Sequence, residues 1–274
     1  MSRIAICAPA TPITAEDAAR VEAIAAEMPG IELHFHPQCF AVSGHFAGSD
    51  AERLEAFLAC ATDPAFEGVW FARGGYGSNR IAADAVARLG KAAGKSYLGY
   101  SDMGYLLAAL YKAEIGVPAH GPMPVDIRRF DGAEAVRRAL GWFGDRTAGI
   151  EPSLNPSGRE PPVVAFNLMT LAALCGTDLM PDLAGHVVMV EEVSEHLYAI
   201  DRLFFHVSQH LRGIAGLRLG RVTDVPENDR HFGADAEEIA RHWCERSGIA
   251  FLGRADIGHD IANKIVPFGV AGKV

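Results

Sequence analysis

The 274-residue sequence lacks a long hydrophobic run, a concentrated basic segment and a closely spaced cysteine pair. No uninterrupted apolar stretch approaches the roughly 18 residues needed to span a bilayer, and the apolar segment at residues 4–10 is too short for a secretory signal. The five cysteines are widely spaced and lie mostly within apolar patterns. We therefore expect a cytoplasmic protein with reduced core thiols and no membrane partner.

Positive charge is also scarce, because 25 Lys and Arg residues face 34 Asp and Glu residues, a net charge of −9. Lys and Arg occur in runs no longer than a pair, such as Arg128-Arg129. A phosphate-binding surface needs a concentrated basic patch, so nucleic acid is not an expected partner. The apolar share of 49% and the charged share of 22% are those of an ordinary globular protein.

The first half of the sequence alternates short apolar runs with amphipathic segments, the pattern of a parallel sheet covered by helices. Thr14 and Asp17 have the spacing of a capping box ahead of an Ala-rich helix. The carboxyl ends of parallel strands share one edge, so residues that follow different strands converge there. The predicted strands are 3–9, 31–36, 68–72 and 97–100, and the predicted helices are 14–28, 50–61, 79–89 and 103–113.

A stretch rich in Pro, Gly and Ser at residues 145–162 interrupts the periodic pattern and predicts a linker. We predict a Rossmann- or flavodoxin-like parallel α/β domain at residues 1–148, a linker at 149–162 and a smaller mixed α/β domain at 163–274. In the second domain the predicted strands are 163–166, 186–190, 215–222 and 249–252, and the predicted helices are 198–211 and 235–247.

Two strand-to-helix turns carry candidate chemistry. The segment Arg73-Gly74-Gly75-Tyr76-Gly77 could hold an anion on its N–H groups, or could be a tight turn that merely needs glycine. It lacks the spacing of nucleotide-binding loops. The segment Gly99-Tyr100-Ser101-Asp102 is a partial match to the turn that presents a nucleophilic serine, although Ser101 and Asp102 could simply cap the following helix.

A late loop, Gly258-His259-Asp260, offers a base, and Glu191-Glu192 at the end of a predicted strand offers an orienting carboxylate. The order Ser101, Glu, His259 is that of α/β-hydrolases, although order alone does not establish a triad. Two histidine pairs, His34 with His36 and His206 with His210, could in principle bind a metal, but no third ligand accompanies either pair. We predict no metal and no cofactor.

Taken together, these segments resemble the muramoyltetrapeptide LD-carboxypeptidases, serine peptidases related to the microcin-immunity acyl-adenylate hydrolases. The resemblance rests on segments in order along almost the whole chain: IAICAPATP at residues 4–12, FAGSDAERLEAF at 46–57, FARGGYGSNRI at 71–81, GYSD at 99–102, HGPM at 120–123, the Asn167-Leu168 turn, VEEVSEHLYAIDRLF at 190–204 and GHDIANKIVPFG at 258–269.

The resemblance implies a metal-independent enzyme in which Ser101 is the nucleophile, His259 the base and Glu191 its orienting carboxylate, with Glu192 as the fallback. It implies an oxyanion hole formed by the N–H groups of Gly75 and Asp102. It further implies substrate contacts from three side chains, Arg73, Tyr76 and Asn167. Arg73 is the expected partner of a terminal carboxylate.

The expected activity is release of the terminal D-alanine from cytoplasmic peptidoglycan tetrapeptides during murein recycling. The expected partners are a small peptide substrate and a second copy of the chain, because members of the family are commonly dimeric. Gly104-Tyr105 and Phe166 depart from the family pattern next to the site, which leaves substrate preference open. Two alternatives remain at this stage: hydrolysis of acylated aminoacyl-adenylates, and muropeptide binding without catalysis. Metal-assisted hydrolysis by His34 and His36 or by His206 and His210 is a minor third alternative.

Overall fold

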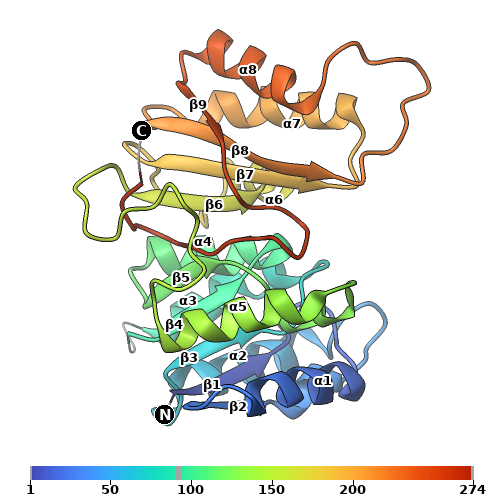
Figure 1. The fold of residues 1–274 in the computed structure, drawn as a ribbon, viewed down its shortest axis with the longest axis vertical. Coiled ribbons are helices and arrows are strands. Elements are labelled where there is room, and N and C mark those ends of the chain that lie inside the picture. Colours follow the sequence, from blue (N-terminus) through green and yellow to red (C-terminus); the bar gives the residue numbers. More distant parts are fainter. Residues whose placement is uncertain (1, 91–93, 273–274) are drawn as a thin grey trace.

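The computed structural model describes residues 2–90 and 94–272, which form two sheets flanked by helices (Figure 1). The first sheet has the order β10-β5-β4-β3-β1-β2 and the second the order β6-β7-β8-β9. All neighbouring strands are parallel except β10, which runs antiparallel to β5. The order β5-β4-β3-β1-β2 is that of flavodoxin-like folds. The predicted α/β class is therefore confirmed.

The strands of the first sheet are β1 (Ser2–Cys7), β2 (Ile31–Phe35), β3 (Gly68–Phe71), β4 (Ser96–Gly99), β5 (Val117–His120) and β10 (Val266–Pro267). Its helices are α1 (Ala15–Ala26), α2 (Asp50–Thr62), α3 (Ala82–Leu89), α4 (Gly104–Lys112) and α5 (Gly132–Gly144). The second sheet contains β6 (Val163–Asn167), β7 (Val187–Val193), β8 (Gly216–Thr223) and β9 (Phe251–Arg254), with helices α6 (Leu168–Leu174), α7 (Leu197–His210) and α8 (Ala236–Ser247).

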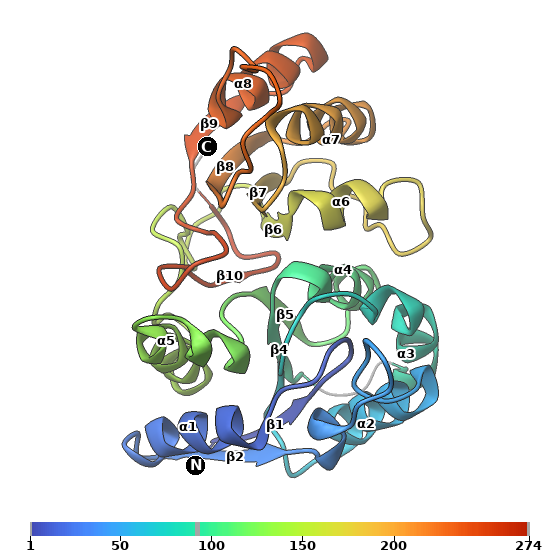
Figure 2. The same cartoon turned by 90° about the vertical axis from the view of Figure 1, so that its right-hand side faces the viewer.

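Helices cover both faces of the first sheet, with α2, α3 and α4 on one side and α1 and α5 on the other (Figure 2). Every residue of β3 and β4 is buried, as a parallel strand between two helical layers requires. A Cβ on Gly68 would lie 2.6 Å from Phe143, so glycine lets α5 pack closely on β3.

Four elements lie outside the predicted set: β5, α5, α6 and β10. The β5 strand has four residues, one of them Pro118, and α6 has seven, so neither supports a clear periodic pattern. The β10 strand is a two-residue segment whose assignment rests on its pairing with β5. Helix α5 begins after Asp131, which adopts a left-handed backbone conformation without a side-chain cap.

One of two apolar core clusters extends across both sheets, and the other lies between the first sheet and helices α1 and α5. Helix α4 of the first sheet packs on α6 of the second, and a Cβ on Gly104 would lie 2.8 Å from Thr170 Cγ2. Residues 266–267, which the sequence analysis assigns to the second domain, pair with β5 of the first. The segment between β9 and β10 therefore joins the two sheets, and it carries His259.

All five cysteines are free, and four of them are buried. None of the helices formed by residues 2–90 and 94–272 combines the length and the apolar character required to span a bilayer.

Candidate active site

Ser101 lies at the carboxyl end of β4, where the short 3-10 helix Ser101–Met103 leads into α4. Its backbone φ is 61°, in the left-handed region that residues with a Cβ rarely adopt. Holding such a conformation costs about 1–3 kcal/mol, so the surrounding structure has to impose it. A sharp turn of this kind between a strand and a helix exposes a serine hydroxyl above the edge of the sheet.

The glycine turn that follows β3 lies directly against Ser101. A Cβ on Gly74 would be 3.2 Å from Ser101 Oγ, so a side chain there would crowd the hydroxyl. Gly75 has a φ of 98°, and a Cβ on it would be 2.8 Å from Thr11 Cγ2. The Thr11 hydroxyl donates a hydrogen bond of 2.6 Å to the Gly74 carbonyl. Both space and backbone conformation therefore require glycine in this turn.

Asp102 joins the serine turn to the glycine turn. Its buried carboxylate accepts hydrogen bonds from the N–H groups of Gly77, at 3.2 Å, and Ser78, at 2.9 Å. The Ser78 hydroxyl donates to the Asp102 carbonyl at 2.5 Å. Burial raises the pKa of Asp102, and the hydrogen bonds from Ser78 and Gly77 oppose that rise. The side chain of Asp102 therefore holds the two turns together, while its N–H stays available for a ligand.

Among the N–H groups of this junction, those of Gly75 and Asp102 matter most for the predicted chemistry. Among residues 2–90 and 94–272, no acceptor pairs with the N–H of Gly75 or of Asp102. One follows Gly74 and the other follows Ser101, so both flank the contact between the two turns. N–H groups in this position are suited to an anionic oxygen that develops near a serine hydroxyl.

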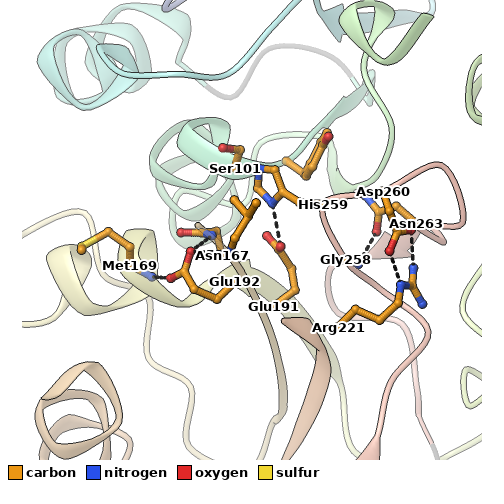
Figure 3. Close-up of polar contacts among 12 residues, drawn as sticks. Ser101, Asn167, Met169, Glu191, Glu192, Arg221, Gly258, His259, Asp260 and Asn263 are labelled. Carbon is orange, nitrogen blue, oxygen red and sulfur yellow. Dashed lines mark hydrogen bonds and ion pairs between the residues drawn. The ribbon is translucent and has the colours of Figure 1, made fainter. Parts of the chain in front are cut away.

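His259 is held by Glu191 across the second sheet. Its Nδ1 lies 2.7 Å from Glu191 Oε2, and the Glu191 side chain is completely buried (Figure 3). The carboxylate fixes Nδ1 as the donor, which leaves Nε2 unprotonated in the neutral ring. Burial lowers the pKa of His259, but the charge of Glu191 and its hydrogen bond outweigh burial, so the pKa is raised overall.

Glu192 points away from His259. Its carboxylate accepts hydrogen bonds from Asn167 Nδ2 and from the Met169 N–H, both at 2.8 Å (Figure 3). Asn167 in turn caps α6 by accepting a hydrogen bond from the Thr170 N–H. Adjacent strand residues face opposite sides of a sheet, so only one of the two glutamates reaches the histidine.

Ser101 and His259 line the same cleft, which has a volume of about 370 Å³. The Tyr100 ring packs 4.7 Å from the His259 ring, and its hydroxyl donates to Asp126 at 2.8 Å. The remaining lining residues are Arg73, Gly74, Gly75, Met123, Val125, Asp126, Arg128 and Arg129. A larger hollow, of about 900 Å³, is lined by residues between 197 and 254 and contains none of the predicted site residues.

Three arginines give the cleft a positive character. Arg128 is paired with Asp17, and Arg129 with Asp126. Arg73 donates only to the Pro12 carbonyl, at 3.2 Å, and no carboxylate pairs with it among the described residues. Burial lowers the pKa of Arg73, as does the neighbouring Arg128. A guanidinium of this kind is suited to the carboxylate of a ligand.

Of the eight predicted site residues, four line this cleft: Arg73, Gly75, Ser101 and His259. Glu191 lies behind the lining against His259, and Asp102 follows Ser101 without lining the cleft. Tyr76 is exposed beside Phe46, and Asn167 is engaged with Glu192, so these two do not line the cleft either. Sequence reasoning missed the segment at residues 123–129, which supplies Asp126, Arg128 and Arg129. The HGPM motif at residues 120–123, whose Met123 begins this segment, was the available signal, because its His120 ends β5.

The histidine pairs considered as metal ligands lie elsewhere. His34 stacks on Phe66, and His206 and His210 lie side by side on α7. No group of three His, Cys, Asp or Glu residues suited to a metal ion occurs in the part of the chain that the structure describes.

Comparison with known proteins gives a consistent family. Residues 4–121 match the LD-carboxypeptidase N-terminal domain, and residues 160–274 match the LD-carboxypeptidase C-terminal domain. A protein of Streptomyces coelicolor named as a carboxypeptidase is 30% identical over 98% of this chain and 89% of its own. The murein tetrapeptide carboxypeptidase of Pseudomonas aeruginosa is 26% identical over 97% of this chain and 91% of its own.

Solved structures agree with these matches. The muramoyltetrapeptide carboxypeptidase from Oxalobacter formigenes superposes with a TM-score of 0.80 at 26% identity, covering 98% of this chain and 93% of that one. The microcin C7 self-immunity protein has a TM-score of 0.76 at 18% identity, covering 98% and 91%. At 18% identity, the similarity to the microcin C7 self-immunity protein shows a shared fold only.

Proposed function

This chain belongs to the LD-carboxypeptidase family of serine-type hydrolases, and on that premise we propose that it removes the terminal D-alanine from murein tetrapeptides in the cytoplasm. We assign Ser101 as the nucleophile, His259 as the general base and Glu191 as the carboxylate that orients it. The observation that supports this assignment is the 2.7 Å hydrogen bond that leaves His259 Nε2 free in the cleft lined by Ser101.

In the first half of the proposed reaction, Ser101 Oγ attacks the carbonyl carbon of the L,D amide while His259 Nε2 takes the hydroxyl proton. The carbonyl oxygen becomes an anion, which the N–H groups of Gly75 and Asp102 stabilise. Removing one such donor costs on the order of 10²–10³ in turnover. His259 then gives its proton to the amine of the departing D-alanine, and an ester with Ser101 remains.

In the second half, a water molecule attacks the ester while His259 again accepts the proton. The tetrahedral intermediate collapses, Ser101 regains its proton from His259, and the tripeptide leaves with a new carboxylate. Glu191 keeps its negative charge throughout, since its part is to hold the imidazole and to balance the imidazolium.

Arg73 is the proposed receptor for the carboxylate of the departing residue. It is a cleft-lining guanidinium without a carboxylate partner among the described residues. Hydrogen bonds to charged groups contribute about 1.5–3 kcal/mol each, so this contact would favour a substrate with a free terminal carboxylate. Tyr76 and Asn167 remain proposed as residues that border the bound peptide.

The decisive experiment is mass spectrometry of a murein tetrapeptide incubated with the purified protein. Loss of one D-alanine is expected with the wild type, and no loss with Ser101→Ala. A serine-directed fluorophosphonate probe should label the wild type but not that variant. Cleavage by Ser101→Ala would refute the assignment, and peptide binding without turnover or labelling would identify a binding protein instead.

Adding a competitor to the same incubation distinguishes the proposed activity from the acyl-adenylate alternative. The microcin C7 self-immunity protein has been solved in complex with glutamyl sulfamoyl guanosine. The proposal predicts that this compound neither binds tightly nor competes with the tetrapeptide here. Tight competition would favour the alternative substrate class.

Further parts of the proposal concern assembly. We propose a homodimer, and the domains at residues 1–148 and 163–274 with a linker at 149–162. Light scattering coupled to size-exclusion chromatography tests the dimer, and limited proteolysis tests the linker.

A further inference from the structure

His120 is a second buried histidine beside the site, and the proposed mechanism does not use it. It ends β5 and is 1% exposed. Its Nε2 lies 3.2 Å from Oδ1 of Asn263, which is also 1% exposed. Asn263 lies in the segment between β9 and β10, four positions after His259. Two buried polar side chains from distant parts of the sequence thus meet next to the proposed base.

The direction of this hydrogen bond follows from a third group. The Gly258 N–H donates to the same Asn263 oxygen at 3.1 Å. A backbone N–H is only a donor, so this side-chain atom is the acceptor oxygen and the orientation of the amide is fixed. His120 Nε2 must therefore carry the hydrogen. Burial lowers the pKa of His120 to about 4, which keeps the ring neutral at pH 7 despite the nearby Glu191.

His120 lies between the strand that leads to Ser101 and the loop that carries His259. On one side, His120 pairs in register with Gly99 of β4, two residues before Ser101. On the other side, the oxygen that it holds also binds Gly258, the residue just before His259. The Tyr100 ring lies 5.7 Å from the His120 ring and 4.7 Å from the His259 ring.

Other contacts hold the same loop from its outer side. Arg221 pairs with Asp260, and Arg138 donates to the Asn263 carbonyl at 3.1 Å. These contacts attach the loop to β8 and to α5. Neither attaches it to the strand end that leads to Ser101; there the loop is held by the His120–Asn263 contact, by the Tyr100 ring against His259 and by the pairing of Val266 with His120.

We propose that His120 is a positioning residue that, through Asn263, sets the spacing between Ser101 and His259 and does not itself transfer protons. The inference rests on the proposed function for the identity of the base. Its physical basis is that a displacement of about 1 Å in a catalytic group costs roughly 10²-fold in rate. The burial of His120 and the engagement of its Nε2 separate it from substrate.

Two variants test the proposal directly. Gln can place an amide N–H where His120 Nε2–H lies, whereas Phe keeps the ring but has no donor. His120→Phe should lower kcat by about 10–10²-fold with KM within about threefold of wild type. His120→Gln should recover most of that loss. An equal loss in both variants would indicate that the imidazole itself takes part, and normal kcat in His120→Phe would remove the proposed role; either outcome overturns it.

A double-mutant cycle tests the route through Asn263. Asn263→Ala removes the same link from the other side, and it serves as the test if His120→Phe does not fold. The double variant should lose no more than Asn263→Ala alone, because that change already removes the His120 contact together with the Gly258 contact. A loss equal to the product of the two would overturn the proposal. His206→Phe on the exposed face of α7 is the control for loss of a histidine.

The rate of fluorophosphonate labelling at Ser101 provides a readout that does not depend on the substrate, since it needs only the serine and its base. If the wild type labels but does not cleave murein tetrapeptides, the substrate proposal fails while the His120 comparison still applies. Labelling should slow in His120→Phe and recover in His120→Gln. Unchanged labelling in His120→Phe would contradict the positioning role.

Discussion

Gly74 lies beside Ser101 and leaves no room for a side chain of its own next to the Ser101 hydroxyl. A Cβ added to Gly74 would be 3.1 Å from Ser101 Cβ and 3.2 Å from its Oγ. The backbone φ of Gly74 lies outside the positive region, so available space, not conformation, requires glycine here. The turn after β3 therefore limits where the Ser101 hydroxyl can point.

Gly74→Ala should lower kcat by about 10–10²-fold, because the new methyl group displaces the hydroxyl from its place in the cleft. Steady-state kinetics of D-alanine release would measure this loss. The thermal midpoint should change little, since the methyl group would meet only side-chain atoms of Ser101 and Met123, none closer than 3.1 Å. Gly144→Ala is a suitable control, because a Cβ there would have no atom within 4 Å. Normal kcat in Gly74→Ala would contradict the contact.

Glu191→Gln should reduce kcat by about 10²–10⁴-fold, as expected when the acceptor that fixes the tautomer of the base is lost. The pH dependence of activity tests the same contact independently. His259 must be neutral to act as the base, and Glu191 raises its pKa, so activity in the wild type falls as pH drops through that raised value. In Glu191→Gln the carboxylate no longer raises the pKa of His259, whereas burial still lowers it. The acidic limb of the pH–activity profile should therefore move to lower pH.

Glu192→Gln is the matched comparison for that pH profile, because Glu192 contacts Asn167 and Met169 in place of His259. Its acidic limb should stay near that of the wild type. A limb that moves as far in Glu192→Gln as in Glu191→Gln would show that the shift does not come from the direct hydrogen bond.

Arg73→Gln should raise KM by about 10–10²-fold and leave kcat within a few fold, since a charge-assisted hydrogen bond to the substrate is lost. A tetrapeptide whose terminal carboxylate is amidated removes the substrate's part of the same contact. The wild type should discriminate against it, and the variant should treat the two peptides alike. Undiminished discrimination in Arg73→Gln would place the carboxylate elsewhere, with Arg128 the next candidate in the cleft.

Asp17→Asn should lower the free energy of unfolding at pH 7 by about 1–3 kcal/mol, because Asp17 both completes the cap of α1 and pairs with Arg128. Its hydrogen bond with Arg128 lowers the pKa of Asp17 in the folded state. This stabilisation is present above the unfolded pKa of about 3.9 and is lost as pH falls towards the lowered folded value. Urea unfolding at several pH values should show the difference from wild type shrinking below pH 4.

The exposed ion pair of Arg3 with Glu32 is the control for that measurement. Glu32→Gln should change the free energy of unfolding by less than about 1 kcal/mol at any pH, because solvent screens exposed pairs. A comparable loss in both variants would attribute the effect to net charge.

The first half of the fold could be predicted from the sequence because its signals are local. Alternating apolar runs gave β1 to β4, and the Thr14 and Asp17 spacing gave the start of α1, whose capping box is present in the structure. The sequence offered no comparable signal for β5, α6 and β10. These are short elements, and β10 depends on its pairing with β5, so tertiary contacts decide them.

By itself, the sequence determined the α/β class, the order of Ser101, Glu191 and His259 along the chain, and the glycines that the turn after β3 requires, since each follows from residue type and spacing. Only the tertiary structure decided which of the two glutamates contacts His259, that Asn167 binds Glu192, and that the arginines at 128 and 129 share a cleft with Ser101. The physical reason is that side-chain direction and long-range packing depend on how distant segments meet. A local sequence pattern does not specify these contacts between distant segments.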